Sequence, residues 1–433
     1  MDKTRVAGSG VDALEAADWY RQPIALFSGG NEVRWLRGGD ALFPAMIEAI
    51  DAARETVWLA TYIFHHDETA RLMAHALAAA AARGVQVRVV VDGFGSKASL
   101  PSLRYWWTGQ AVELAVFRRI DRWWAVLQPG QLRRLHQKLC VVDAKIAFVG
   151  GINIIDDRND LNHGFGDVPR LDYAVSTRGP VVAPIEQTAR AMWTRAALAP
   201  GWREEMLALA RSAEPLNQVR GLLRRLRIVK PSRGSEETPS QPMLAAFVVR
   251  DNLRQRRAIE RSYIDAIRGA RRRIDLVCSY FYPGHQFLRT LRSAARRGVA
   301  VRLLVQGKLD YRIAGMAAQA LYDDLLHHGV RVFEYTPAFL HAKVAIIDDE
   351  WATVGSSNID PLSLLMNLEA NVIVKDAAFA AQLAADLELA FAASAEVDPT
   401  SAQRKGFWRA VQRALVAWTA YVVVRAGGIT GRY

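Results

Sequence analysis

The sequence predicts an α/β protein made of two similar domains, and three observations lead to that prediction. Short apolar runs rich in β-branched residues alternate with Ala-, Leu- and Arg-rich stretches, which indicates the order strand, helix, strand. The same order occurs twice along the 433 residues. A stretch with three prolines and four Ser or Thr residues, 231–242, separates the two copies and has the composition of a flexible linker.

Each copy begins with the same strand–helix–strand unit, and this alternation favours parallel pairing of its two strands. For example, RGVQVRVVVDG (83–93) in the first copy matches RGVAVRLLVQG (297–307) in the second. The predicted elements are strands at 57–64 and 274–281, helices at 69–82 and 286–296, and strands at 83–93 and 297–307. The predicted domain boundaries are 30–218 for the first domain, 219–243 for a basic stretch and linker, 244–400 for the second domain and 404–433 for a tail.

A third match between the copies is closer. HQKLCVVDAKIAFVGGIN (136–153) aligns with HAKVAIIDDEWATVGSSN (341–358), and His, Lys, Asp, Gly and Asn all repeat at an offset of 205. Each run predicts a strand, a short turn and a second strand that brings the Asn back towards the His and Lys. Alternation along a strand would place His136 and Lys138 on one face, and the same holds for the second copy.

These residue types suit phosphoryl transfer. A neutral imidazole is a nucleophile, and a protonated one is an acid near neutral pH. Lys and Asn can hold phosphate oxygens and stabilise an anionic transition state. If the copies face each other, one His would attack phosphorus and the other would protonate the leaving oxygen, without a metal or cofactor. A purely structural repeat is the alternative, although structural strands rarely need His and Lys together on one face.

The motif HxKxxxxD followed by Gly-Ser-x-Asn resembles the signature of the phospholipase D superfamily. Both copies are complete, except that Gly151 stands where the first Ser would be. The resemblance implies two α/β/α sandwich domains related by a pseudo-two-fold axis, with one shared active site. It implies that His136 becomes a covalent phospho-histidine, and that His341 acts as general acid and then base.

The resemblance also gives expectations for the other motif residues. Lys138, Lys343, Asn153, Asn358 and Ser356 would bind phosphate, and Asp143 and Asp348, the motif carboxylates, would support the catalytic groups. Two further carboxylates, Asp172 and Glu369, follow each His by about thirty residues within strand-like runs. They are candidates for fixing the histidine tautomers, and a surface carboxylate on an edge strand is the alternative for each.

The resemblance narrows to bacterial cardiolipin synthases of the shorter, B-type group and covers roughly residues 30–430. The runs that carry it include DGFGS (92–96), YFYPGHQFLRTLRSAARRGV (280–299) and HAKVAIIDDEWATVGSSNIDPLSLLMNLEANVIV (341–374). It implies phosphatidyl transfer from a donor phospholipid to phosphatidylglycerol. The donor stays open between phosphatidylglycerol and phosphatidylethanolamine. A phospholipase or endonuclease of the same superfamily and an inactive lipid-binding scaffold are the alternatives.

The charge and the apolar segments predict a peripheral enzyme on the cytoplasmic face of the cell membrane. Lys plus Arg number 56 against 44 Asp plus Glu, a net charge of +12 that suits an anionic membrane surface better here than nucleic acid. The apolar run 414–424 is about half of a spanning helix. It lies in a predicted basic amphipathic helix, 404–425, typical of an interfacial anchor. The Trp-rich segment 104–127 is a second candidate or a helical lid, and the two cysteines predict no disulfide framework or cysteine-rich metal site.

Overall fold

The computed structural model describes residues 24–119, 133–161, 164–198, 243–251, 255–307, 322, 324–360 and 367–398. The predicted C-terminal amphipathic helix, the basic run 219–230 and the linker 231–242 lie outside these residues. No helix in the described ranges is both long enough and apolar enough to cross a membrane.

The first half of the chain contains the strand–helix–strand unit predicted from the sequence. In chain order its elements are β1 (Ser28–Arg37), α2 (Gly38–Asp51), β2 (Thr56–Thr61), α3 (Glu68–Ala82), β3 (Gln86–Asp92), the 3₁₀ turn η1 (Lys97–Ser99), α4 (Leu100–Trp106), β4 (Val112–Phe117), β5 (Leu139–Val142), β6 (Ile146–Gly150), β7 (Asn159–Asp160), β8 (Gly164–Phe165), β9 (Tyr173–Arg178) and α5 (Val182–Leu198). The helical lid predicted for 104–127 is wrong where the structure describes that segment, because α4 ends at Trp106 and β4 follows. Trp107 is instead buried, and its indole N–H donates to the carbonyl of Ala74.

The second half repeats the plan. Its elements are β10 (Met243–Arg250), α8 (Ala258–Gly269), β11 (Arg273–Cys278), α9 (His285–Arg296), β12 (Ala300–Gln306), β13 (Arg331–Tyr335), β14 (Lys343–Ile347), β15 (Trp351–Gly355), β16 (Glu369–Lys375), α12 (Ala377–Ala392) and β17 (Ser394–Glu396). Both halves keep the predicted strand–helix–strand unit with parallel pairing, β2 with β3 and β11 with β12.

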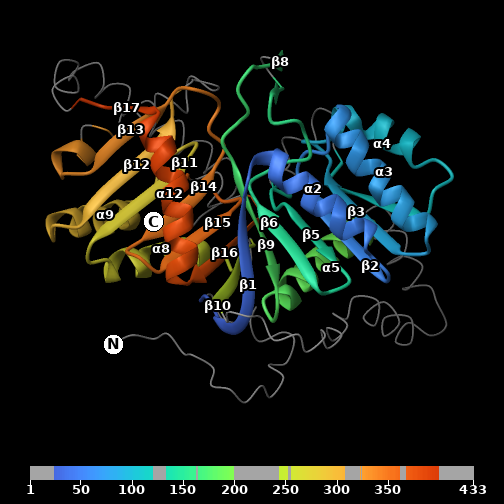
Figure 1. Ribbon diagram of the computed structural model, residues 1–433, viewed down its shortest axis with the longest axis horizontal. Helices are drawn as coiled ribbons and strands as arrows, with labels where there is room; N and C mark the ends of the chain where they lie inside the picture. The colour runs from blue at the N-terminus through green and yellow to red at the C-terminus, as the bar shows by residue number, and fades with distance from the viewer. Residues whose placement is uncertain are drawn as a thin grey trace, which may run out of the picture.

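All the main strands belong to one sheet, which runs through both halves (Figure 1). Its order is β17-β13-β12-β11-β14-β15-β16-β10-β1-β9-β6-β5-β2-β3-β4. From the central β10–β1 pair outwards, each half presents its equivalent strands in the same order, with the extra strand β17 at one edge. This arrangement is what a pseudo-two-fold axis between the halves produces. The four strands next to the centre of each half pair antiparallel, so the sheet is mixed.

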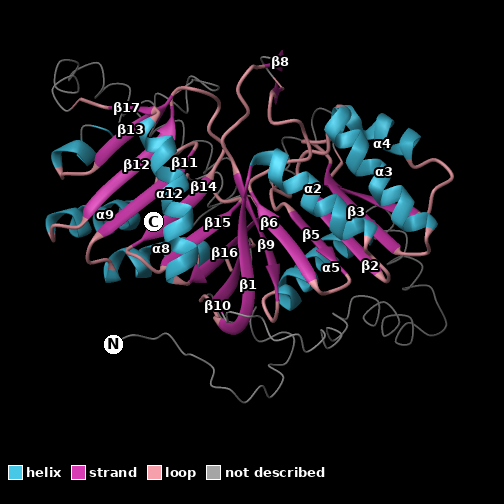
Figure 2. Ribbon diagram, viewed as in Figure 1, coloured by secondary structure: helices cyan, strands magenta, loops and turns pink. Residues whose placement is uncertain are grey.

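Helices cover both faces of the sheet, which gives three layers (Figure 2). In the first half α2 and α3 lie on the face opposite α5, and in the second half α8 and α9 lie on the face opposite α12 (Figure 1). Each pair of helices has its own apolar core against the sheet. The side chains of α5 and α12 share a third core with strands of both halves. The halves are therefore packed together through a common apolar interior.

The motif carboxylates Asp143 and Asp348 lie away from the histidines, which corrects the expectation that they support the catalytic groups directly. Each follows its strand, β5 or β14, at the end opposite the His, with φ near +51°. The Asp143 carboxylate accepts backbone N–H groups of residues 54–56, at 2.8 to 2.9 Å. The Asp348 carboxylate accepts those of residues 271–273, at 2.8 to 3.2 Å. Each Asp thus ties a hairpin turn to the start of the neighbouring strand.

We expect Asp143→Ala to lower the free energy of unfolding by about 1–3 kcal/mol, because it leaves backbone donors unpaired, one of them half-buried. Catalytic activity of the remaining folded protein should stay near that of the unchanged protein. Urea denaturation and a turnover assay measure the two effects. Asp51→Ala, at an exposed residue, is the matched control. Loss of turnover without loss of stability would contradict this structural role.

Candidate active site

Two backbone contacts between the halves place the histidines. One parallel bridge joins Leu135, just before β5, to Leu368, just before β16. A second joins Leu340, just before β14, to Leu171, just before β9. The His136 N–H donates to the Leu368 carbonyl at 3.1 Å, and the His341 N–H donates to the Leu171 carbonyl at 2.8 Å. Each motif His is therefore fixed by backbone of the other half.

The same crossing brings each His to a carboxylate of the other half. The Glu369 carboxylate lies 3.0 Å from Nδ1 of His136, and the Asp172 carboxylate lies 2.6 Å from Nδ1 of His341. A carboxylate at Nδ1 holds the proton on that nitrogen and leaves Nε2 free to react. Both carboxylates proposed as orienting groups thus contact a His, but neither contacts the His that precedes it in its own half.

Both motif lysines are buried beside their histidines. Lys138 is 6% exposed and Lys343 is 1% exposed. The Lys138 ammonium donates to the carbonyl of His136 at 2.8 Å, and Lys343 donates to the carbonyl of His341. Burial lowers the pKa of Lys138 to about 7, and burial also lowers the pKa of Lys343. An anionic phosphate in the site would restore the charged form of both.

Electrostatic interactions link the groups of the two halves into one site. Burial lowers the pKa of His136, and the charge of Lys343 from the other half lowers this pKa further. The negative charge of Glu369 acts in the opposite direction and raises it. Burial lowers the pKa of His341 well below its ordinary value, and the charges of Lys343 and Lys138 lower it further. Both histidines are accordingly neutral in the empty site near neutral pH.

The two carboxylates differ in charge. Burial raises the pKa of Asp172 to about 7, so this carboxyl is partly protonated near neutral pH. Burial would also raise the pKa of Glu369, but the interaction with His136, the positive charge of Lys138 and the hydrogen bond from Ser356 keep it below its ordinary value. The first His therefore faces an anion, and the second shares a proton with its partner.

Ser356 and Gly151, equivalent in the repeat, explain part of this difference. The Ser356 hydroxyl is buried and donates to Glu369 at 2.6 Å, and it accepts the N–H of Ala370 at 3.0 Å. This placement corrects the expectation that Ser356 binds phosphate, because the hydroxyl is engaged with the orienting carboxylate. At Gly151 a Cβ atom would lie 2.4 Å from a carboxylate oxygen of Asp172. The motif departs from Ser there because Asp172 occupies the space.

The two asparagines lie where the returning strand ends, as the hairpin predicts. The Asn153 carbonyl accepts the N–H of Ile63 at 3.2 Å, which leaves its amide N–H groups to donate elsewhere. The buried carbonyl oxygen of Asn358 has no hydrogen-bond partner within the described ranges. Their phosphate-binding role stays a prediction.

Three residues near the histidines were missed by sequence reasoning. The ring of Tyr62 lies 5.0 Å from that of His136, and the Lys138 ammonium lies 5.6 Å from the Tyr62 ring. The Gln137 amide donates to the Glu369 backbone at 3.0 Å, and the charge of Arg170 lowers the pKa of His341. A signal for Tyr62 and Gln137 was available, because the aligned second copy has Ser279 and Ala342 at these positions.

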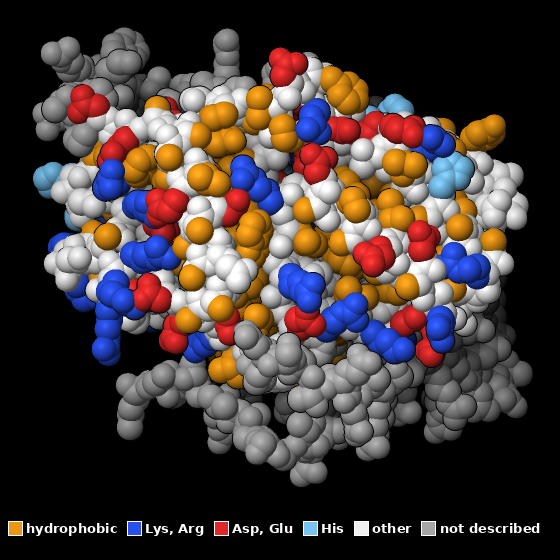
Figure 3. Space-filling view, in the orientation of Figure 1, with side chains coloured by type: hydrophobic (Ala, Val, Ile, Leu, Met, Phe, Trp, Pro, Cys, Tyr) orange, Lys and Arg blue, Asp and Glu red, His pale blue; other side chains and the backbone are white. Residues whose placement is uncertain are grey.

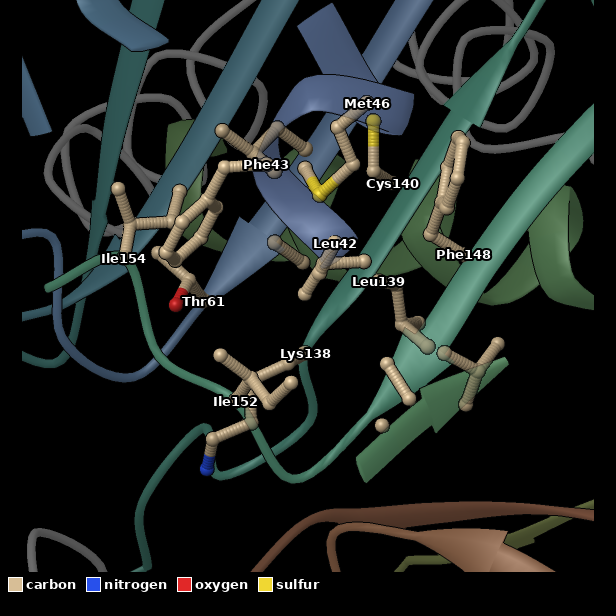
Figure 4. Close-up of a pocket in the computed structure, with 15 residues that line it drawn as sticks. Leu42, Phe43, Met46, Thr61, Lys138, Leu139, Cys140, Phe148, Ile152 and Ile154 are labelled. Atoms are coloured by element: carbon tan, nitrogen blue, oxygen red, sulfur yellow. The ribbon is translucent and has the colours of Figure 1, made fainter. Parts of the chain in front are cut away.

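A small cavity of about 20 Å³ lies behind Lys138, between α2 and the strands β5 and β6 (Figure 4). Its wall is mostly apolar and includes Phe43, Met46 and Phe148, and the Lys138 nitrogen points away from them. About one water molecule would fill such a volume, so it does not hold an acyl chain. Its apolar wall contributes to the burial that lowers the pKa of Lys138.

Known protein families match the chain in two ranges, one in each half. The family model described as "Cardiolipin synthase, PLD-like domain" matches residues 46–166 and 263–390. The chain belongs to this cardiolipin synthase family. A cardiolipin synthase B of Escherichia coli is 36% identical over 392 residues, which are 89% of this chain and 87% of that protein. A cardiolipin synthase A of Pseudomonas entomophila is 31% identical over 369 residues, 85% of this chain and 70% of that protein.

Two solved structures have a fold similar to that of this chain. The phosphatidylserine synthase of Haemophilus influenzae has a TM-score of 0.62, is 12% identical and covers 90% of this chain and 93% of its own. A polyphosphate kinase of Porphyromonas gingivalis has a TM-score of 0.51 at 15% identity and covers 85% of this chain and 49% of its own. At these identities the similarity shows the fold, two phospholipase D-like halves. Within the described ranges no group of three or more His, Cys, Asp or Glu side chains could hold a metal ion.

We expect Glu369→Gln to lower kcat by about 10²–10⁴-fold, because the neutral amide no longer fixes the Nδ1 proton of His136. The Glu369 charge raises the pKa of His136, so its removal lowers that pKa. The acid limb of the pH profile, which follows protonation of His136, should therefore move to lower pH. Glu48→Gln, at an exposed carboxylate on α2, is the control. An unchanged kcat and pH profile in Glu369→Gln would contradict the positioning role.

Proposed function

We propose that the chain synthesises cardiolipin by moving a phosphatidyl group from a donor phospholipid to phosphatidylglycerol. The observation that carries this proposal is the crossed pair of His–carboxylate contacts, which gives one nucleophile and one acid–base group in a single buried site. The relatives named cardiolipin synthase, which match most of the chain, supply the substrate class. Phospholipids are accordingly the substrates.

In the first step Nε2 of His136 attacks the phosphorus of the donor. The Glu369 anion at Nδ1 supports the positive charge that develops on the ring. The P–N bond forms as the bond between phosphorus and the head-group oxygen breaks. His341 gives its Nε2 proton to that oxygen, so the head group leaves as a neutral alcohol and the phosphatidyl group stays on His136.

In the second step the terminal hydroxyl of phosphatidylglycerol attacks the phospho-histidine. His341, now neutral, takes the hydroxyl proton while the new P–O bond forms and the P–N bond breaks. The products are cardiolipin and the regenerated histidines, with His341 again protonated. The two steps balance in protons, so the cycle needs no external acid or base.

Substrate binding favours uptake of a proton from solvent by His341. Without substrate, burial lowers the pKa of His341, and the two lysine charges lower it further. A phosphodiester anion between Lys138 and Lys343 offsets their positive charges. Its negative charge also attracts the protonated imidazole and so raises the pKa of His341. The Asp172 carboxyl, whose pKa is raised to about 7, lies at Nδ1 and can share the proton. Substrate binding therefore prepares the general acid.

Hydrolysis is the second candidate outcome, because water could attack the same phospho-histidine in place of the lipid hydroxyl. Phospholipase or nuclease activity would then replace synthesis. The burial of both lysines and of Asp172 excludes water from the inner side of the site, whereas the side chains of His136 and His341 are 13% and 27% exposed. Separating cardiolipin from phosphatidic acid after incubation with phosphatidylglycerol vesicles distinguishes the two reactions.

We also propose that the chain works at an anionic membrane surface, as a peripheral protein on the cytoplasmic face. Support comes from α8, α9 and the residues beside them. Residues 256–297 contain eleven arginines and three carboxylates, whereas the equivalent residues 39–84 contain three arginines and six carboxylates. An open groove of about 360 Å³ on this face is lined by Arg268, Arg289 and Arg297 with three polar side chains. Such a surface attracts anionic head groups.

We expect a donor phospholipid labelled in its phosphate to label the protein at His136. His136→Ala should take up no label, because it lacks the nucleophile. His341→Ala should still be labelled by a donor with a good leaving group, which needs no protonation, but should make no cardiolipin. Acid-labile label and product lipids are measured, with His75→Ala, at an exposed histidine, as control. Full synthesis by either active-site variant would exclude the two-histidine mechanism.

We expect Arg289→Gln/Arg296→Gln to bind phosphatidylglycerol vesicles roughly thirtyfold more weakly at low salt, since each exposed arginine near the surface contributes about 1 kcal/mol. The difference should vanish in about 1 M NaCl, where the Debye length is about 3 Å. Vesicle co-sedimentation measures both. Arg54→Gln, at an exposed arginine of the first half, is the control. Equal binding of the double variant and the unchanged protein at low salt would rule out this surface.

A further inference from the structure

One short hairpin breaks the symmetry between the halves. Nineteen positions separate Asn153 from Asp172, but only eleven separate Asn358 from Glu369. The first half thus has eight extra residues between its motif and its orienting carboxylate. This longer segment contains β7 and β8, a two-stranded sheet separate from the main one, which projects beyond the body of the molecule (Figure 1).

The tip of this hairpin carries apolar side chains in solvent. Leu161 is 54% exposed, Phe165 is 72% exposed and Val168 is 49% exposed. They are three of the eight large hydrophobic side chains that are exposed in the described part of the chain, and they fall within eight consecutive positions. Hydrophobic side chains are visible at this end of the molecule in Figure 3. Exposed apolar residues gathered on one projection mark a contact surface.

The base of the hairpin is tied to the body of the protein. The Arg170 guanidinium donates to the carbonyl of Asn159 at 3.0 Å, and the Arg170 N–H donates to the carbonyl of Asp157 at 2.9 Å. The Asn159 amide donates to Asp67 at 3.2 Å, and Asp67 caps the start of α3 through the N–H of Ala70. The apolar tip is therefore presented in a defined direction.

The hairpin also leads directly into the active site. Val168 is four residues before Asp172, and four extended residues span at most about 14 Å. Asp172 contacts His341, and Arg170 is close enough for its charge to lower the pKa of His341. A group bound at Val168 is thus held within about 14 Å of Asp172.

We propose that this tip inserts into the lipid bilayer, with Leu161, Phe165 and Val168 at the boundary between head groups and acyl chains. This inference rests on the proposed function, since it assumes that the substrate phosphate belongs to a membrane lipid. Insertion by about 5–10 Å is typical of such interfacial elements, and it would bring head-group phosphates towards the histidines. A second copy of the chain is a poorer partner, because three side chains cannot supply the roughly 1,200 Å² of a stable interface.

The charges at the tip distinguish its contact with the bilayer from the electrostatic attraction of the arginine-rich surface of α8 and α9. The tip carries the exposed carboxylate Asp167, and at its base Asp160 is paired with Arg170 at 3.8 Å. No described side chain between Leu161 and Val168 is basic, so attachment through the tip depends on burial of apolar area. That contribution is not screened by salt, whereas attraction through arginines is.

The test compares Leu161→Ser/Phe165→Ser with Leu72→Ser/Leu389→Ser, a control that changes two exposed leucines on α3 and α12. Binding to vesicles of phosphatidylethanolamine and phosphatidylglycerol is measured by co-sedimentation in about 1 M NaCl, where charge is screened. The tip variant should bind at least tenfold more weakly than the control. Its synthesis of cardiolipin from vesicles should fall in proportion, and its turnover of monomeric short-chain phosphatidylglycerol should stay within about twofold.

Two results would overturn the inference. One is equal vesicle binding by the tip variant and the control. The other is a parallel loss of turnover on vesicles and on short-chain substrate, which would mean that the hairpin acts on the site through Asp172. Failure of the proposed function looks different. In that case the unchanged protein makes no cardiolipin from either substrate, while its vesicle binding still depends on Leu161 and Phe165.

Discussion

The contact on which the rest of this site depends is the crossing of the two halves at the histidines. Each His takes a backbone hydrogen bond and an orienting carboxylate from the opposite half. Neither half could fix its own imidazole alone. The common sheet and the apolar core shared by α5 and α12 are therefore conditions for catalysis, because a small rotation between the halves would break both His–carboxylate contacts together.

Burying this many ionisable groups costs free energy, and the pattern of the pKa shifts shows how the cost is limited. Lys138, Lys343 and both histidines shift towards their neutral forms, and Asp172 shifts towards its protonated form. The empty site thus carries less net charge than its composition suggests. A phosphate anion reverses the shifts of the lysines and of His341. Binding energy from one anionic group can in this way charge the site at the moment when charge is needed.

Much of the site could be predicted from the sequence, because a repeat at a fixed offset of 205 identifies the motif and strand alternation groups its residues. The crossing could not be predicted, since it joins segments far apart in the chain whose local patterns are alike. The roles of Asp143 and Ser356 were predicted wrongly for a related reason. Both are polar motif residues, and only the structure shows that their oxygens are engaged with backbone N–H groups and with Glu369. The helical lid failed because α4 stops and β4 begins within the Trp-rich segment.

The differences between the two copies carry as much functional information as their similarity. Gly151 makes room for an Asp172 carboxyl with a raised pKa, whereas Ser356 donates to a Glu369 carboxylate with a lowered pKa. An anion beside His136 favours attack on phosphorus, and a partner that shares a proton with His341 favours acid–base exchange. The eight-residue insertion again falls on the Asp172 side. In the proposed mechanism the two copies therefore supply different groups, the nucleophile from one and the proton donor from the other, while the crossed contacts keep the two histidines in one site.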